Sequence, residues 1–383
     1  MKYSVRSIFR KVHLWLGMLS GIVIFIVAIT GCIYAFQDEI KDMFRPSLSV
    51  EATGKPFLSP EVLKEKATAY VFITPADSSN AIYGVMYNTF DKAASLGCNF
   101  NESGYTILYV NPYDGTLIHK ESFNNDFFRS ALAGHRSLWL PYTIGKQVIG
   151  WSVWVFVIVL LSGLILWFPK KWNRKSIGTG LKIKWKAPFT RVNYDLHNVL
   201  GFYTAVFALI IALTGLTWSF EWFSTSYYSL VTGGKEFKKW EPALSDTTQA
   251  SLEANTSTLL WEQMKKEYPI GSKGTFRFDY PRTKSDAFMV CYNPSSVTYY
   301  TREYRFFDQF SLQELTGGGS YGINAKQVTL GDKLFRMSYD IHSGSIFGLP
   351  GRILAFLVSL VIASLPITGV IIWWRKKKKR KRS

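Results

Sequence analysis

Four long stretches without an acidic or basic residue constrain this 383-residue chain more than any other feature. They contain 26, 23, 25 and 22 residues. Because about 20 helical residues cross a hydrocarbon core about 30 Å thick, each stretch can span a bilayer. The alternative, four buried helices of a water-soluble protein, would require a charged or polar face that these stretches lack. We therefore predict four transmembrane helices, between Lys11 and Asp38, Lys146 and Lys170, Asp195 and Glu221, and Arg352 and Arg375.

Basic residues are concentrated at three places: the N-terminal tail, the loop between the second and third stretches, and the C-terminal tail. Together these segments hold twenty basic residues and one acidic residue, whereas the segments 37–146 and 221–352 hold 25 basic and 26 acidic residues. Basic loops stay on the cytoplasmic side of a membrane. We expect both termini and the central loop to be cytoplasmic and the two long loops to be outside. The net charge of +18 then reports membrane orientation and gives no reason to expect a nucleic-acid partner.

The N-terminal stretch has a second interpretation, because a basic start, an apolar run and Ile29-Thr30-Gly31-Cys32 together resemble a lipoprotein cleavage site. The apolar run, however, continues past Cys32 to Phe36. The third stretch carries a matching Thr-Gly pair followed by Leu216 where the cysteine would fall. We therefore expect this segment to be retained as a helix.

The chain consists of two copies of one unit. Residues 10–36 align with residues 194–220 without a gap, and 162–168 resemble 368–374. Each long loop offers one helical pattern (61–70 and 259–268), followed by alternating runs typical of strands, at 81–88 and 105–110, then at 274–280, 287–292 and 297–307. Each half is predicted to be a span, a small α+β module and a second span. Both halves run in the same direction, so the repeat is parallel.

The predicted fold class is a membrane α-helical protein with two small extracytoplasmic α+β modules. Its predicted segments are 1–36 (tail and first span), 37–142 (module), 143–169 (second span), 170–195 (basic loop), 196–220 (third span), 221–349 (module), 350–374 (fourth span) and 375–383 (basic tail). Cys98 and Cys291 fall in the outer modules, where oxidising conditions permit a disulfide. Whether they pair is left open.

Four of the five histidines occupy corresponding points of the repeat. His13 and His197 begin the first and third spans on the cytoplasmic side, and His135 and His342 precede the second and fourth spans on the outer side. His119 is expected to be an ordinary surface residue. Neutral imidazole binds haem iron, copper or zinc. One pair of histidines from two helices near each face is the arrangement of a membrane b-type cytochrome, so we predict two haem b groups, an inner one on His13 and His197 and an outer one on His135 and His342.

Glycines share a helix face with these histidines, because positions 13, 17 and 31 fall within about 40° of one another at about 100° per residue. A flat porphyrin needs such a wall without side chains, although glycines also serve helix packing. The glycines predicted to face haem are Gly17, Gly31, Gly201 and Gly215. The arginines at suitable levels for haem propionates, or for anchoring at the membrane edge, are Arg10, Arg136, Arg191 and Arg352. Alternatives for the histidines are polar caps, a bare metal site or a proton relay, and no carboxylate accompanies them in the spans.

Several motifs together resemble those of the PepSY-associated transmembrane proteins, often called iron-regulated membrane proteins. They are Arg-Lys-x-His-Leu-Trp-Leu-Gly at 10–17, Thr-Gly-Cys-x-Tyr at 30–34, Ser-Gly-Leu-Ile-Leu-Trp at 162–167, His-Ser-Gly-x-x-Phe-Gly at 342–348 and Tyr-Val-Asn-Pro-Tyr-Asp-Gly at 109–115. Some members are similar to inner-membrane ferric-siderophore reductases with two b haems. The resemblance implies haem ligation by His13, His135, His197 and His342. The usual Leu-His-Arg reads Gly134-His135-Arg136 here, which keeps the His-Arg pair.

The resemblance implies reduction of a periplasmic ferric siderophore or another ferric chelate at a bacterial inner membrane. The Gly-rich run at 317–322 does not open a helix after a strand, so it is no dinucleotide fingerprint. Electrons are therefore expected from a membrane quinol or from a separate cytoplasmic partner, for which the basic inner face could provide a docking surface. Two other functions are open: a non-catalytic sensor or protease regulator, which would tolerate loss of all four histidines, and a siderophore or iron transport component. The uninterrupted spans argue against transport.

Overall fold

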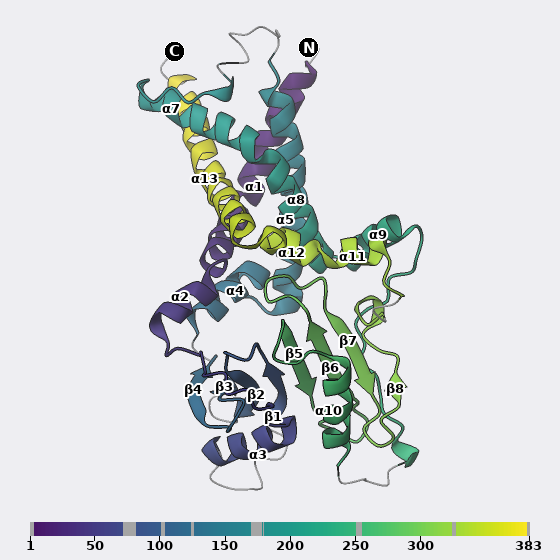
Figure 1. Ribbon diagram of the computed structural model, residues 1–383. Coiled ribbons are helices and arrows are strands. Elements are labelled where there is room, and N and C mark those ends of the chain that lie inside the picture. Colours follow the sequence, from purple (N-terminus) through teal and green to yellow (C-terminus); the bar gives the residue numbers. More distant parts are fainter. Residues whose placement is uncertain are drawn as a thin grey trace. The chain divides into compact units, whose positions relative to one another are not determined.

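The computed structural model describes residues 4–71, 82–100, 104–123, 126–169, 178, 180–249, 255–323 and 327–380. Some of the basic residues used above, including Lys170 and Arg174, lie outside them. The chain divides into two compact units (Figure 1). The helical unit comprises Met1–Gln37, Phe127–Tyr227 and Ser338–Ser383, and the sheet unit comprises Asp38–Asp126 and Tyr228–Met337.

Four long apolar helices form the helical unit, as predicted. Each is long and apolar enough to cross a membrane, and together they make this a multi-pass membrane protein. The candidate spans are Val5–Tyr34, Tyr142–Trp167, Phe189–Ser219 and Ser345–Lys378. The helices are α1 (Val5–Tyr34), α5 (Tyr142–Trp167), α8 (Gly201–Ser219), which continues from α7 (Phe189–Asp195) through the π-helical η2 (Leu196–Leu200), and α13 (Gly348–Arg380), which follows the 3-10 turn η6 (Ser345–Phe347).

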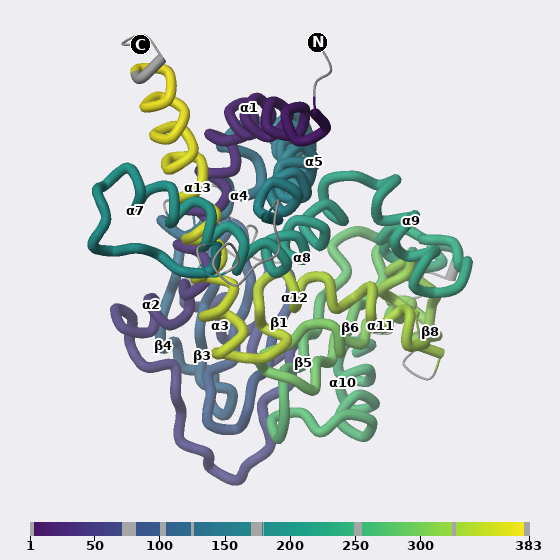
Figure 2. Tube along the Cα trace, turned by 90° about the horizontal axis from the view of Figure 1, so that it is seen from above, coloured from purple at the N-terminus to yellow at the C-terminus, as the bar shows by residue number. Residues whose placement is uncertain are grey.

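The four long helices pack in a ring, in the order α1, α5, α8, α13 (Figure 2). Small residues at the contacts, such as Ala28 on α1, Ala208 on α8 and Ala363 on α13, are buried and let the helices approach closely. Two short helices pack against these four. Helix α4 (Phe127–Ser137) packs on α1 and α5, and α12 (Ser338–Ser343) packs on α8 and α13, so the repeat is preserved.

The sheet unit holds one antiparallel sheet of eight strands and the helices that follow or flank it. The strands are β1 (Ile82–Tyr87), β2 (Ala94–Phe100), β3 (Gly104–Val110), β4 (Leu117–Ser122), β5 (Thr275–Asp279), β6 (Phe288–Asn293), β7 (Glu303–Phe307) and β8 (Glu314–Leu315). The helices are α2 (Gln37–Phe44), α3 (Pro60–Val71), α9 (Glu221–Thr232), which runs into this unit from the helical one, α10 (Thr256–Glu267) and α11 (Leu330–Arg336), with 3-10 turns η3 (Thr247–Gln249) and η4 (Gly319–Tyr321).

The two predicted α+β modules share this sheet. Its strand order is β4-β3-β2-β1-β5-β6-β7-β8, so the pairing of β1 with β5 joins the first half to the second. Helices α3 and α10 cover the same face, where Leu63 and Trp261 are buried with Val85 and Phe278. The repeat read from the sequence therefore produces one core and not two.

Two local features differ from the expected pattern. Strand β7 begins only at Glu303, because the preceding residues form a turn in which the Asn293 side chain donates to the Thr298 carbonyl at 2.9 Å. Strands β2, β4 and the two-residue β8 were not predicted, and the small residues of β2 weaken its alternating pattern. Residue 81 of the expected run 81–88 lies outside the described residues.

Cys98 and Cys291 are both buried and free. Cys98 lies on β2 and Cys291 on β6, with β1 and β5 between them. Three strand spacings amount to about 14 Å, whereas disulfide-bonded cysteines have Cα atoms about 4.4–6.8 Å apart. The sheet order therefore holds Cys98 and Cys291 too far apart to form a disulfide with each other.

The Gly-rich run lies in the sheet unit, where it closes against another loop. Gly318 and Gly319 have φ angles of 75° and 54°, and the Ser320 amide donates to the Lys238 carbonyl at 3.0 Å. A Cβ atom on Gly319 would lie 1.9 Å from the Lys239 carbonyl oxygen. Glycine is therefore required for a close approach of two backbones, a structural role that needs no bound nucleotide.

Candidate functional site

The inner histidine pair lies where α1 faces the start of α8. The His13 and His197 rings have centroids 6.2 Å apart and planes at 88°. His13 is on α1, and His197 lies within η2. π-helical turns are rare overall, but those that occur are often at functional sites. This one carries the predicted ligand His197.

The hydrogen bonds of the inner pair determine which ring nitrogen is free. His13 Nδ1 is 3.0 Å from the Val159 carbonyl oxygen, which can only accept, so Nδ1 carries the proton. His197 Nδ1 is 2.9 Å from Thr368 Oγ1, and that hydroxyl donates to helix carbonyls of Ser364 or Leu365 at 3.0 Å. Its oxygen is therefore left to accept from the imidazole. Both rings keep the Nε2 lone pair for a ligand.

The outer histidine pair repeats this geometry on the two short helices. The His135 ring of α4 and the His342 ring of α12 have centroids 6.0 Å apart and planes at 65°. His135 Nδ1 donates to the Val27 carbonyl at 2.8 Å, and His342 Nδ1 donates to the Ile211 carbonyl at 2.9 Å. Burial lowers the pKa of His135 and lowers that of His342 to about 4, so these imidazoles are neutral. Neutral imidazole is the form that binds a metal.

Each histidine ring packs against a glycine of a neighbouring helix. An added Cβ would lie 3.0–3.3 Å from the ring Cε1 atom in all four cases. The pairs are His13 with Gly163, His197 with Gly369, His135 with Gly31, and His342 with Gly215. Any larger residue at these positions would have to displace an imidazole. Two of these glycines, Gly163 and Gly369, were seen in the repeat alignment but were given no role.

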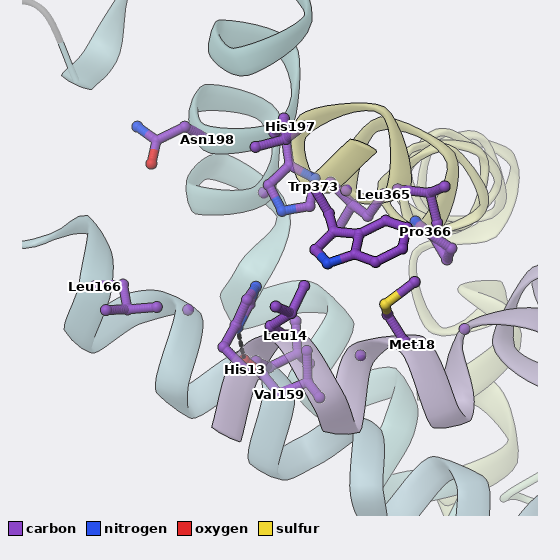
Figure 3. Close-up of a pocket in the computed structure, with 18 of the residues that line it drawn as sticks. His13, Leu14, Met18, Val159, Leu166, His197, Asn198, Leu365, Pro366 and Trp373 are labelled. Atoms are coloured by element: carbon purple, nitrogen blue, oxygen red, sulfur yellow. Dashed lines mark hydrogen bonds between the residues drawn. The ribbon is translucent and has the colours of Figure 1, made fainter. Parts of the chain in front are cut away.

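A cavity of about 910 Å³ surrounds the inner pair (Figure 3). Its size lies within the range of cofactor and ligand sites, about 300–1,000 Å³. Gly17 and Gly201 line it, together with Trp373, Leu365 and Pro366 of α13. The predicted haem-facing glycines thus separate into two groups: Gly17 and Gly201 border the cavity, while the other two abut the outer imidazoles.

Cationic side chains are among the residues that line the inner cavity. They are Arg10, which the sequence analysis named, and Arg6 and Lys376, which it did not single out. No carboxylate occurs among the described residues that line it. A cavity lined by basic residues and no carboxylate favours an anionic group on the ligand. Arg191 has another role, since it forms an ion pair with the buried Asp195 at 2.9 Å.

The outer arginines and the remaining histidine have local contacts of their own. The Arg136 guanidinium lies over the Tyr142 ring, 5.3 Å from its centroid. Arg352 lies over the Phe36 ring, at 5.7 Å. His119 stacks on Tyr109 in the sheet unit, with ring centroids 6.1 Å apart.

Each pair offers two nitrogens to a central atom. Two imidazoles that bind one metal ion from opposite sides, each at about 2 Å, have ring centroids about 6 Å apart, as both pairs do. Among the described residues, no cluster of three or more histidine, cysteine or acidic side chains could complete the shell of a bare ion. In a haem, the porphyrin provides four of the iron's nitrogen ligands, and the protein provides the remaining two. The donor set therefore fits haem.

Comparison with known proteins identifies one family. The model of the PepSY-associated TM region matches residues 10–376, which include both histidine pairs and the sheet unit. No curated protein matches the chain.

Proposed function

Since the chain belongs to the PepSY-associated TM region family, we propose that it is a dihaem b-type reductase that passes electrons across the inner membrane to a ferric chelate on the outer side. The observation that carries this proposal is the pair of matched histidine couples, with ring centroids 6.2 and 6.0 Å apart. In each couple the Nδ1 atoms are occupied by hydrogen bonds to neighbouring helices. Such bonds fix ligand orientation and raise ligand basicity.

The chain's own residues would hold the two groups at different levels. His13 and His197 would hold the inner haem through their Nε2 atoms, and His135 and His342 would hold the outer one in the same way. Arg10 and Lys376 would bind propionates at the inner cavity. Arg6 also lines it, but its guanidinium donates to the Leu166 and Phe168 carbonyls at 2.6 and 3.0 Å. When bound, haem supplies a one-electron couple whose potential depends on its ligands and their hydrogen bonds. The concentration of basic residues in the two tails and the central loop supports an orientation with the inner pair toward the cytoplasm.

The proposed substrate is a ferric siderophore or a similar ferric chelate. Each turnover moves one electron from the protein to Fe³⁺ and yields Fe²⁺. Because oxygen-rich chelators prefer the harder Fe³⁺ ion, reduction weakens the complex and releases iron. The electron donor would be a membrane quinol or an acidic cytoplasmic protein that docks on the basic inner face.

Anaerobic mixing of the dithionite-reduced, purified chain with a ferric hydroxamate tests the reductase proposal, with a ferrous-specific chromogenic chelator to trap the product. Residual dithionite is removed first by gel filtration. We expect the reduced absorbance to decay as ferrous iron appears, up to two electrons for each chain. The His135→Ala variant should retain the inner haem and react more slowly. A haem-loaded protein that no ferric chelate oxidises would refute the reductase function, and a colourless protein would favour the sensor interpretation.

A further inference from the structure

Helix α2 carries an apolar stripe that the protein leaves uncovered. The side chains of Ile40, Met43 and Phe44 are 37%, 77% and 84% exposed. Positions 40, 43 and 44 lie on one side of a helix, because residues three and four apart are neighbours on its surface. Asp38 and Asp42 are exposed on the other side. The helix is thus amphipathic, with its apolar side facing outward.

The orientation of α2 on the sheet unit is fixed by ion pairs. Lys41 Nζ lies 2.6 Å from Glu121 and 2.8 Å from Asp126, with only 14% of the Lys41 side chain exposed. One turn later, Arg45 reaches Glu121 at 3.3 Å and lies over the Tyr109 ring. Both cations point toward β3 and β4. The apolar stripe is therefore held away from the sheet.

Chain continuity places this stripe at the edge of the bilayer. Helix α1 ends at Tyr34 and α2 begins at Gln37. Three residue steps of at most about 3.6 Å each keep the end of α1 and the start of α2 within about 11 Å of each other. The charge-free part of α1 runs from residue 12 to residue 34. At 1.5 Å per residue its length of about 35 Å exceeds the hydrocarbon core and enters the headgroup layer. Helix α2 therefore begins at headgroup level.

We infer that α2 lies on the outer leaflet as an interfacial helix, with Ile40, Met43 and Phe44 inserted among the lipids and its aspartates in water. An apolar face opposite a charged face is the pattern of helices that bind at the boundary of headgroups and acyl chains. The inference does not depend on haem or on reductase activity. It also gives Lys41 and Arg45 a role, because they hold α2 against β3 and β4 with its apolar stripe turned away from the sheet.

An environment-sensitive fluorophore distinguishes lipid from water at this helix. Met43→Cys and, as a matched control, Asp42→Cys are each labelled with NBD in the full chain and reconstituted into nanodiscs. The native cysteines are buried, so the introduced thiol is the reactive one. Quenching is measured with doxyl-labelled lipid and with aqueous iodide.

We expect the label at position 43 to be blue-shifted and quenched mainly by doxyl lipid, and the label at position 42 to be quenched mainly by iodide. Equal iodide quenching at both positions would overturn the inference. So would a label at position 43 that neither agent reaches, because the stripe would then be covered by protein, such as a second copy of the chain. Both quenching results can be interpreted whether or not the purified protein contains haem.

Discussion

Removing the Thr368 hydroxyl tests how the chain controls the inner histidine pair. Thr368→Val keeps the side-chain shape but deletes Oγ1, which lies 2.9 Å from His197 Nδ1. The Thr368 carbonyl remains and still accepts from Asn193 Nδ2 at 3.1 Å, so the contact between α7 and α13 is retained. The substitution thus removes a partner of the ligand and leaves the helices in place.

The size of the effect follows from the value of one hydrogen bond. A neutral hydrogen bond contributes about 0.5–1.5 kcal/mol, and tenfold in a one-electron equilibrium is about 1.4 kcal/mol or 59 mV. If the whole bond favours the oxidised form, its loss raises the inner midpoint potential by about 20–65 mV. The direction is upward because a hydrogen-bonded imidazole is the more basic ligand and stabilises Fe³⁺.

A spectroelectrochemical titration of the purified protein measures both potentials at once. Thr368→Ser should restore the wild-type value. Thr204→Val deletes a hydroxyl that donates to the Leu200 carbonyl at 2.8 Å, and it should change neither potential. An inner potential that is unchanged in Thr368→Val would refute the assigned hydrogen bond. A shift confined to the outer group would refute the assignment of His197 to the inner pair.

Three further predictions concern the two histidine pairs and the sheet unit. Gly215→Val should expel the outer haem and spare the inner one, measured by haem content, because even a Cβ would lie 3.1 Å from His342; full occupancy would contradict this. His13→Ala should remove only the inner component of the redox difference spectrum, and loss of both would show that the pairs are wrongly assigned. Burial alone would raise the pKa of Asp332, but hydrogen bonds from Thr329, Tyr228 and Lys235 hold it well below its usual range. The charged carboxylate of Asp332 therefore stabilises the fold above the unfolded pKa of about 3.9, and this stabilisation is lost as pH falls toward the lower folded pKa. Asp332→Asn should remove about 2 kcal/mol of stability at pH 7 and so lower the melting temperature. It should also narrow the difference in melting temperature between pH 7 and pH 3, and an unchanged pH dependence would contradict this prediction.

The spans and the histidine pairs were predictable because their signals are local. Charge-free length identifies a membrane helix, and the gapless match of His13 to His197 shows which histidines correspond. The pairing of β1 with β5 was not predictable, since strand order across the repeat leaves no local signature. The placement of His135 on α4, in the helical unit and not in the module, depends on the same kind of long-range packing.

Residues that orient the ligands were only partly visible in the sequence. Ser162-Gly163 and Thr368-Gly369 stood out as a repeated pair, yet nothing in the sequence shows that Gly163 abuts His13. The π-helical turn at His197 is also invisible, because it depends on how α7 and α8 meet α13. Corresponding positions in a repeat are the signal that could have identified these residues.

Haem stoichiometry tests the central claim most directly. The full chain is purified in mild detergent from cells supplied with haem precursor, and a pyridine haemochrome assay is combined with a reduced-minus-oxidised spectrum. The two histidine pairs predict two b-type haems for each chain, with no high-spin component, since each pair provides both axial nitrogens. A protein that contains no haem, or a single haem that survives loss of either pair, would contradict the account.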